Sequence, residues 1–447
     1  MGRLHTLRQV AMYLNLKTGI AASVNGVNID TRILKPGDLF FALKGDRVDG
    51  HNFLSEAASK RASAAIVAST YEGPCYGLPI LKVEDPLQAL QELTKEVLKE
   101  QKPRIVAVTG SVGKTTTKEF ISTFLRSRYK LASSLGNYNS QAGIPLTILN
   151  HTTGAEEVLV LEMGMTLPGH LARLVQIAPP EVAVLTAVTL VHAVNFKGVE
   201  EIAWTKSEIF SSPQTRLAIL PREVTAYQEI INQYSSNFVS YSTCQTEADY
   251  YLNPEKPSLL YAHKESLQRH LPSLQVPGKH NLSNLLAAIS VARYFSLSWE
   301  EIAALIPALS LIPNRLQFIE HQEMLFLNDA YNACELSTKA ALDTLPLAQA
   351  PGRKIAVLGS MLELGKFSDE SHQRVGEYAV ECVDQLYCLG EECLPMHRQF
   401  QKAGKPSQLF LERLDLVEHL RKILKPLDVV LLKGSCSKEL WKILDEI

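Results

Sequence analysis

Residues 106–116 read VAVTGSVGKTT and predict a buried strand, a glycine-rich turn and the start of a helix. Glycine at positions 110 and 113 lets the backbone bend until consecutive N–H groups point to one place, and the following helix directs the positive end of its dipole at the same place. Such a turn is suited to phosphate groups. Lys114 would reach the β- and γ-phosphates of a nucleotide, and the hydroxyl of Thr115 would bind Mg²⁺.

The motif has the form T-G-x-x-G-K-T. The commoner pattern G-x-x-x-x-G-K-[ST] is not met, because its first glycine would fall on Val108. An ordinary strand–turn–helix junction with an exposed lysine is the alternative interpretation. We predict that ATP or GTP binds here, and that the contacts come from seven loop residues: Gly110, Ser111, Val112, Gly113, Lys114, Thr115 and Thr116.

The composition around this motif is that of an ordinary globular protein. The chain has 447 residues, 46% of them apolar and 21% charged, and its net charge of −2 predicts no nucleic-acid partner. The longest apolar stretches, such as residues 182–191, have about half the length of a membrane span, and the first residues lack the features of a signal peptide. Seven cysteines include no C-x-x-C pair and are typical of reduced thiols. We therefore expect a cytoplasmic protein without membrane insertion.

Strands that alternate with helices predict an α/β protein with mostly parallel sheets. The length suggests three domains, which we place at residues 1–102, 103–313 and 314–447. A charged stretch at 99–104 predicts a linker after a helix at 86–98. The main predicted strands lie at 39–43, 64–68, 105–108, 158–162, 182–188, 217–220, 325–327, 355–358, 385–389 and 429–432. Helices are expected at 115–126, 281–295, after 337 and near 372–379, and a short β excursion within 235–275.

Polar residues follow the central strands, where ligands of open parallel sheets bind. Glu162 ends one strand and can hold a cation together with phosphate oxygens and water, or else cap a helix or face solvent. His192 follows the next strand and can ligate a metal or act as a base, although a loop histidine is more often structural. Lys206 lies on a predicted helix and by spacing alone is a solvated lysine. Asn281 and Asn284 share a face at a helix start, where their amides would read the edge of a base or cap the helix.

Further motifs occur in a fixed order along the chain. They are DTR at 30–32, PGDLF at 36–40, LKG at 43–45, TGSVGKT at 109–115, GNYN at 136–139, GIP at 143–145, EMG at 162–164, His192, KSEIF at 206–210, HNLSN at 280–284, NR at 314–315, NDAYNA at 328–333, ELG at 363–365 and KGS at 433–435. This ordered set resembles the Mur ligases, the ATP-dependent amide-forming enzymes of peptidoglycan synthesis. No single motif is decisive, but their order over nearly the whole chain is very specific.

The resemblance implies a smaller N-terminal α/β domain that holds the UDP end of a sugar nucleotide, with Thr31, Arg32 and Lys44 nearby. It also implies a central domain of the P-loop ATPase type that binds ATP. The C-terminal domain would be Rossmann-like, bind the incoming dipeptide and close over the site. The substrate-facing residues would further include Asn137, Asn139, Tyr331 and Asn332.

The same resemblance implies roles in metal and nucleotide binding. Thr115, Glu162 and His192 match positions that hold two Mg²⁺ ions, and Lys206 matches a lysine that is carbamylated with CO₂ to support the second ion. Asn281 and Asn284 match adenine contacts, while Arg315 and Asp329 match residues that reach the γ-phosphate and the ribose. The residues expected to act in catalysis are Lys114, His192, Lys206 and Arg315.

The implied activity joins D-alanyl-D-alanine to UDP-N-acetylmuramoyl-tripeptide through an acyl phosphate. The segment DAYNA at 329–333 favours it over the ligase that adds the third residue, which typically has D-Y-A-H-T-P-D there and whose D-N-P-R motif is also absent from this chain. Departures from the family pattern are Gln141, Val194 and Cys436. We expect a monomer; the sequence leaves open whether the third peptide residue is meso-diaminopimelate or lysine.

Three other interpretations are weaker. A nucleotide-driven switch would leave both flanking domains unexplained. A dinucleotide-dependent oxidoreductase requires G-x-G-x-x-G, which residues 359–365 do not supply. A folylpolyglutamate synthase-like ligase would accept glutamate, and the segment at 329–333 argues against it.

Overall fold

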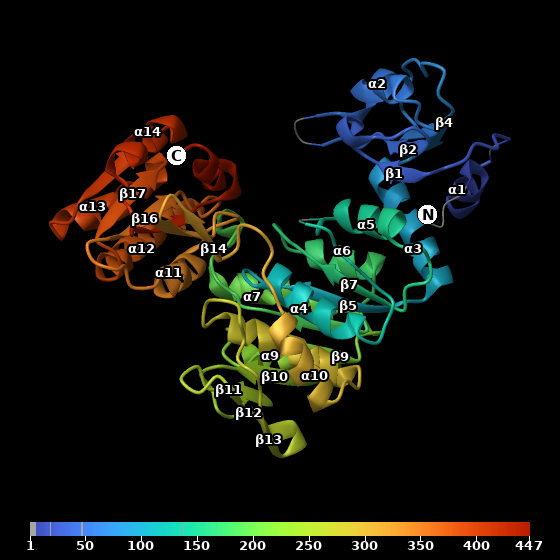
Figure 1. Cartoon of the computed structure of the whole chain (residues 1–447). Coiled ribbons are helices and arrows are strands. Elements are labelled where there is room, and N and C mark those ends of the chain that lie inside the picture. Colours follow the sequence, from blue (N-terminus) through green and yellow to red (C-terminus); the bar gives the residue numbers. More distant parts are fainter. Residues whose placement is uncertain (1–5, 18, 46–47, 137) are drawn as a thin grey trace.

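The computed structural model describes residues 6–17, 19–45, 48–136 and 138–447, which form three β-sheets with helices packed on them (Figure 1). The sheets follow one another along the chain, and each occupies a lobe of its own. Most of their strands are parallel, which confirms the predicted α/β class.

The N-terminal sheet has four parallel strands in the order β1-β2-β3-β4. Its elements are β1 (Gly26–Asn28), β2 (Asp38–Phe41), β3 (Ala64–Ala68) and β4 (Ile80–Val83), with α1 (Leu7–Tyr13), α2 (Leu54–Ser59) and α3 (Pro86–Gln101). Helix α3 runs three residues past its predicted end, so most of the expected linker at 99–104 is helix or strand. Ion pairs three residues apart, Lys95 with Glu92 and Lys99 with Glu96, support this last part of the helix.

The central sheet has nine strands in the order β13-β12-β11-β10-β9-β8-β5-β7-β6, and its only antiparallel pairs are β11–β12 and β12–β13. The strands are β5 (Arg104–Thr109), β6 (Leu131–Ser133), β7 (Val158–Glu162), β8 (Val182–Leu185), β9 (Leu217–Pro221), β10 (Asn237–Ser242), β11 (Tyr250–Leu252), β12 (Leu259–Ala262) and β13 (Leu267–His270). The helices are α4 (Lys114–Arg126), α5 (Gly143–His151), α6 (His170–Ile177), α7 (Val199–Ser207), α8 (Tyr227–Gln233), α9 (Asn281–Tyr294) and α10 (Trp299–Leu305).

Helices cover both faces of this sheet. Val106 and Val108 of β5 belong to the core beneath α4 and α9, whereas Ala107 between them belongs to the core on the opposite face. Strand β8 ends at Leu185, three residues before its predicted end. The hydroxyl of Thr186 donates to the Val112 carbonyl at 2.6 Å, which ties the chain after β8 to the turn after β5.

The C-terminal sheet has the order β14-β15-β19-β16-β17-β18, and only β14 is antiparallel. Its strands are β14 (Gln317–His321), β15 (Met324–Asn328), β16 (Lys354–Gly359), β17 (Gln385–Leu389), β18 (Ser407–Phe410) and β19 (Val429–Lys433), with α11 (Glu335–Thr344), α12 (Ser368–Cys382), α13 (Leu394–Lys402) and α14 (Arg413–Ile423). The sequence did not predict β14 and β18. Both are edge strands with exposed positions, so neither has the continuous apolar run that marks a buried parallel strand.

Within the described residues, no helix combines the length and the apolar character needed to cross a bilayer.

Candidate active site

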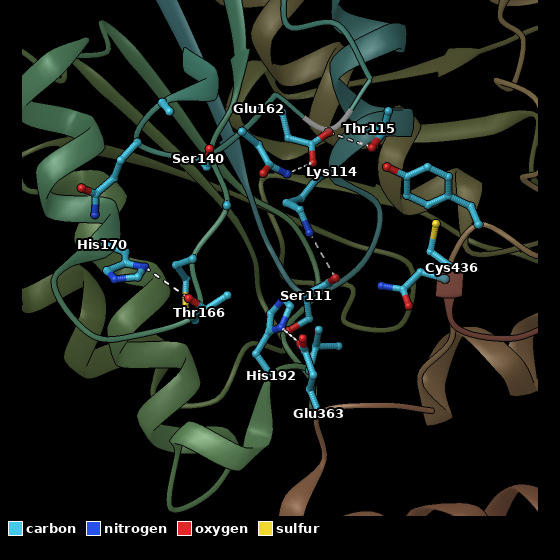
Figure 2. Close-up of a pocket in the computed structure, with 18 of the residues that line it drawn as sticks. Ser111, Lys114, Thr115, Ser140, Glu162, Thr166, His170, His192, Glu363 and Cys436 are labelled. Carbon is cyan, nitrogen blue, oxygen red and sulfur yellow. Dashed lines mark hydrogen bonds and ion pairs between the residues drawn. The ribbon is translucent and has the colours of Figure 1, made fainter. Parts of the chain in front are cut away.

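A cavity of about 2270 Å³ is lined by residues from all three sheets and their loops. The central domain contributes the ends of β5, β7 and β8, which lie side by side at their carboxyl ends. Figure 2 shows Lys114, Thr115 and Glu162 in one cluster of this cavity, with His192 and Glu363 beside it. The predicted phosphate loop and the polar residues after the strands are thus brought together, as expected for an open parallel sheet.

The turn between β5 and α4 needs glycine at two positions. Gly113 has a φ of +84°, and a Cβ atom there would lie 2.4 Å from Oδ1 of Asn284. A Cβ on Gly110 would lie 1.8 Å from Oγ1 of Thr186. The loop can therefore lie this close to its neighbours only without side chains at these positions.

Lys114 is folded back onto its own loop. Its Nζ donates to the carbonyl oxygens of Gly110 at 2.9 Å and Ser111 at 3.3 Å. Burial lowers the pKa of the Lys114 ammonium from its ordinary value, although Glu162 nearby opposes the shift. Burying the ammonium group costs free energy, and an anion bound between the loop and Lys114 would offset this cost.

Glu162, at the end of β7, is 3% exposed and accepts two side-chain hydrogen bonds. The hydroxyl of Thr115 donates to its Oε2 at 2.7 Å, and the Asn139 amide donates to its Oε1 at 2.8 Å. The helix-cap and solvent-facing alternatives therefore do not apply. Asn137, the other asparagine predicted in this loop, lies outside the described residues.

His192 adopts a left-handed backbone with φ +55°. Its Nδ1 is hydrogen bonded to Oε2 of Glu363, which belongs to the C-terminal lobe (Figure 2). Burial lowers the pKa of the His192 imidazole, while Glu363 acts in the opposite direction. Val194, a departure from the family pattern, is 57% exposed and packs against Gly365.

Lys206 lies on α7 and is only 3% exposed, so the interpretation as a solvated lysine is wrong. No side chain in the part of the chain that the structure describes pairs with its ammonium group. Burial, and secondly the positive charge of Lys114, hold the pKa of Lys206 well below its ordinary value.

The two predicted adenine contacts lie at the start of α9 and line the cavity. The Asn281 amide donates to the Pro277 carbonyl at 2.6 Å, and the Asn284 amide donates to Oδ1 of Asn281 at 2.8 Å. His280, not Asn281, is the N-cap residue, and no side chain caps the helix. The capping alternative is thus not realised, and one carboxamide orients the other.

Arg315 connects the segment after the central domain to the phosphate loop. Its Nη2 donates to Oγ1 of Thr115 at 3.0 Å, and its guanidinium lies 4.3 Å from the centroid of the Tyr331 ring. Asp329 makes an ion pair with Lys433 at 2.5 Å and accepts from the Leu316 N–H at 3.1 Å.

Lys433 also donates to the carbonyl of Asn332 at 2.9 Å. Asn332 and Tyr331 line the cavity at this side.

The predicted residues of the N-terminal domain line the same cavity. Thr31 is buried and its hydroxyl donates to Oε2 of Glu56 at 2.9 Å. Arg32 pairs with Asp30 at 2.6 Å and remains 85% exposed, and Lys44 is exposed. Arg32 and Lys44 are thus accessible cations, whereas the Thr31 hydroxyl is hydrogen bonded within the domain.

The protein atoms in the cavity could supply part of the coordination shell of a Mg²⁺ ion. Among the described residues, no group of three or more His, Cys, Asp or Glu side chains could hold a metal ion. Mg²⁺ usually takes only one or two protein carboxylates and fills its shell with phosphate oxygens and water. The Thr115 hydroxyl and the Glu162 carboxylate, which touch each other beside a phosphate loop, suit that arrangement.

Two polar residues in the cavity wall were part of the sequence motifs but had no assigned role. Glu363 contacts His192, which lies 171 residues earlier, and Lys433 contacts Asp329, which lies 104 residues earlier. The ELG and KGS motifs contain Glu363 and Lys433, but only the tertiary structure shows which residues these two contact.

The chain matches three family models along its length. They are described as "Mur ligase family, catalytic domain" at residues 23–97, "Mur ligase middle domain" at 108–292 and "Mur ligase, glutamate ligase domain" at 314–436.

Named relatives match over almost their full length. The UDP-N-acetylmuramoyl-tripeptide–D-alanyl-D-alanine ligase of Bacillus subtilis is 32% identical over 95% of this chain and 93% of its own. The enzyme of that name from Escherichia coli is 30% identical over 98% and 97%.

Solved structures of similar fold also match this chain over most of its length. MurF from Acinetobacter baumannii has a TM-score of 0.85 at 26% identity over 99% of this chain and 98% of its own. MurF ligase from Thermotoga maritima in complex with ADP has a TM-score of 0.80 at 29% identity over 95% and 97%. The chain belongs to the Mur ligase family.

Proposed function

We propose that this chain is an ATP-dependent ligase that joins D-alanyl-D-alanine to UDP-N-acetylmuramoyl-tripeptide in peptidoglycan precursor synthesis. Its relatives from Bacillus subtilis and Escherichia coli carry the name of this reaction. The structural observation that supports it best is the contact of Thr115 in the phosphate loop with Glu162, in a cavity that all three domains line.

The reaction needs activation because a carboxylate does not expel oxide or hydroxide when an amine attacks it. The peptide carboxylate first attacks the γ-phosphorus of ATP, which gives an acyl phosphate and ADP. The amine of D-alanyl-D-alanine then attacks the acyl carbon, loses a proton and expels phosphate as the amide forms. Both steps gather negative charge beside the phosphate loop.

Lys114 and Arg315 would offset this charge. Lys114 lies within the loop, and Arg315 reaches Thr115 from the C-terminal side. Preorganised cations of this kind act where charge develops in phosphoryl transfer. A closed C-terminal domain would exclude the water that hydrolyses an acyl phosphate.

Two Mg²⁺ ions would be held by Thr115, Glu162, His192 and Lys206. When bound, they would neutralise phosphate charge and polarise the transferred group. Thr115 and Glu162 already touch, and His192 and Lys206 lie in the wall of the same cavity.

Lys206 would contribute as a carbamate. The lowered pKa favours its neutral amine, whose lone pair can attack CO₂; loss of one N–H proton then leaves an anion. This anion would remove the repulsion between Lys206 and Lys114 and supply a carboxylate-like ligand for the second ion.

The nucleotide and substrate contacts follow from the cavity wall. Asn281 and Asn284 would face adenine, and Asp329 would accept a ribose hydroxyl through the lone pairs left free by Lys433 and Leu316. The other proposed contacts are to the substrates. They are Thr31, Arg32 and Lys44 for the UDP end, Asn137 and Asn139 for the sugar-peptide, and Tyr331 and Asn332 on the C-terminal side.

The domain boundaries, 1–102, 103–313 and 314–447, belong to this proposal, as do a monomeric state and a cytoplasmic location. The three sheets fall inside these boundaries, with strands from Gly26 to Val83, from Arg104 to His270 and from Gln317 to Lys433.

A phosphate-release assay tests the function. Purified protein is incubated with ATP, Mg²⁺, a UDP-N-acetylmuramoyl-tripeptide and either D-alanyl-D-alanine or single amino acids. We expect phosphate release and an amide product only with the dipeptide, and tripeptides ending in meso-diaminopimelate or lysine will show which is accepted. Release without an amide product, or with glutamate as acceptor, would contradict the proposal.

A further inference from the structure

The C-terminal lobe contacts the central lobe directly beside His192. Residues Ala193–Asn195 and Gly365–Phe367 each form a short 3₁₀ turn, and the two turns pack together. Immediately before the second turn, the Glu363 carboxylate reaches Nδ1 of His192 (Figure 2). The two residues lie in loops that follow strands of different sheets, β8 and β16, so this hydrogen bond joins the central and C-terminal lobes.

The backbone on both sides supports this contact. His192 and Glu363 both adopt left-handed conformations, with φ of +55° and +62°. The Val194 N–H donates to the Glu363 carbonyl at 2.9 Å. Gly365 lies so close that a Cβ atom there would be 3.0 Å from Cα of Val194. The approach of Glu363 to His192 is therefore set by main-chain packing as well as by the side chains.

The contact also selects one form of the imidazole. A neutral imidazole carries a single N–H, on one of its two ring nitrogens. With a carboxylate at Nδ1, the proton belongs on Nδ1 and the lone pair on Nε2. Among the described residues, Glu363 is the one carboxylate hydrogen bonded to His192.

We propose that Glu363 is a positioning residue that orients His192 for Mg²⁺ through Nε2, so that the metal site depends on how the C-terminal domain is docked. This inference rests on the proposed function, in which His192 holds Mg²⁺. Carboxylates that accept the second N–H of a metal-binding histidine are a general device for fixing the ring and its tautomer. In this role Glu363 acts through its hydrogen bond to His192.

Substitution at this position should leave the fold intact. The Glu363 side chain is 58% exposed, and an exposed ion pair adds little stability. The main-chain bond from Val194 is also kept in any variant of Glu363. Asp369, an exposed acidic residue six positions later on α12, offers a matched control for the loss of one negative charge.

The test measures Mn²⁺ binding to the full chain with ADP, by the loss of the free Mn²⁺ signal in electron paramagnetic resonance, without turnover. We expect Glu363→Ala to raise the Kd for Mn²⁺ at least about tenfold, the lower end of the effect of losing the partner of a metal-binding histidine. Glu363→Gln should have a smaller effect, because its amide oxygen still accepts a hydrogen bond. Asp369→Ala should bind Mn²⁺ as the unaltered chain does.

A double-mutant cycle tests whether Glu363 acts through His192. If it does, Glu363→Ala adds nothing to the loss caused by His192→Ala. Additive losses, an unchanged Kd in Glu363→Ala, or an unchanged Kd in His192→Ala would each overturn the inference. Failure of the proposed function is distinguishable, because it appears in the unaltered chain as the absence of D-alanyl-D-alanine ligation.

Discussion

Two lysines in the cavity, Lys114 and Lys206, are buried close enough that the charge of Lys114 contributes to lowering the pKa of Lys206. Lys114 is compensated by loop carbonyls, whereas no described side chain compensates Lys206. A buried ammonium without a partner costs free energy of folding, and the cost disappears when the group is neutral or carries an anion. The burial of these two ammonium groups therefore does not favour folding, and the proposed ligands would offset its cost.

A pH-dependent stability difference follows for Lys206. In CO₂-free buffer without Mg²⁺, we expect Lys206→Met to be more stable than the unaltered chain at pH 7, because burial of the ammonium group disfavours the folded state. At pH values below the pKa of Lys206 in the folded chain, folding buries a charged ammonium group. As the pH rises towards the unfolded value of 10.5, both states become neutral and the difference vanishes. Urea unfolding at pH 7 and pH 10 measures it; a less stable Met variant at pH 7 would refute the argument.

Chemical rescue separates the roles of the two lysines. Lys206→Ala should lose about a hundredfold or more in ligation rate, and added formate or acetate should restore part of it by replacing the carbamate. Lys114→Ala should lose as much and show no recovery, because an anion cannot replace its charge. Ligation is followed by phosphate release. No rescue, together with an unmodified Lys206 by mass spectrometry of the native protein, would count against carbamylation.

At the scale of elements, the unit β5–turn–α4 depends on Gly113. Gly113→Ala places a side chain in a left-handed conformation, at a cost of about 1–2 kcal/mol, and forces it against Asn284. Asn284 also accepts from the hydroxyl of Thr117, so its displacement disturbs the start of both α4 and α9. We expect the affinity for ADP, measured by calorimetry with Mg²⁺, to fall at least about tenfold, the effect of roughly 1.4 kcal/mol.

Gly169 is a control with the same backbone conformation. Its φ is +82°, close to that of Gly113, but no atom lies within 4 Å of a Cβ built there. Gly169→Ala should therefore lose similar stability and keep its affinity for ADP. Equal affinities in both variants would show that backbone strain, and not the contact with Asn284, is the only effect.

Elements with strong local signals were predicted well. Strand β7 has the predicted bounds, and α4 starts one residue before its predicted start, because an apolar run or an amphipathic period is a local property of the chain. Strand β14 was missed because it is exposed along most of its length, and β8 ends early because Thr186 bonds to the phosphate loop. That bond depends on a neighbour 74 residues away.

At the scale of the whole molecule, the cavity between the three lobes is large, and ligation requires that water be excluded from it. We expect the radius of gyration from X-ray scattering to fall when a non-hydrolysable ATP analogue and the UDP-sugar tripeptide are both added. It should move towards about 22 Å, the value for a compact chain of this length. Lys114→Ala with the same ligands should change less. An unchanged radius in the unaltered chain would show that the lobes do not close.

Some features of the candidate site could be predicted from local sequence, whereas others depend on tertiary packing. Lys114, Thr115 and Glu162 were predicted from the loop motif and from their places after strands, and the structure brings them together. The burial of Lys206 was not visible in its helix, because burial depends on what packs around it.

The amino-acid sequence alone determined the phosphate loop, the alternation of strands and helices and the order of the motifs. Each of these features can be identified from residues that are close along the chain. Only the tertiary structure decided that Glu363 meets His192, that Lys433 meets Asp329 and that Arg315 reaches Thr115. These contacts join residues 104 to 200 positions apart, and their geometry follows from how whole domains pack, which no local pattern records.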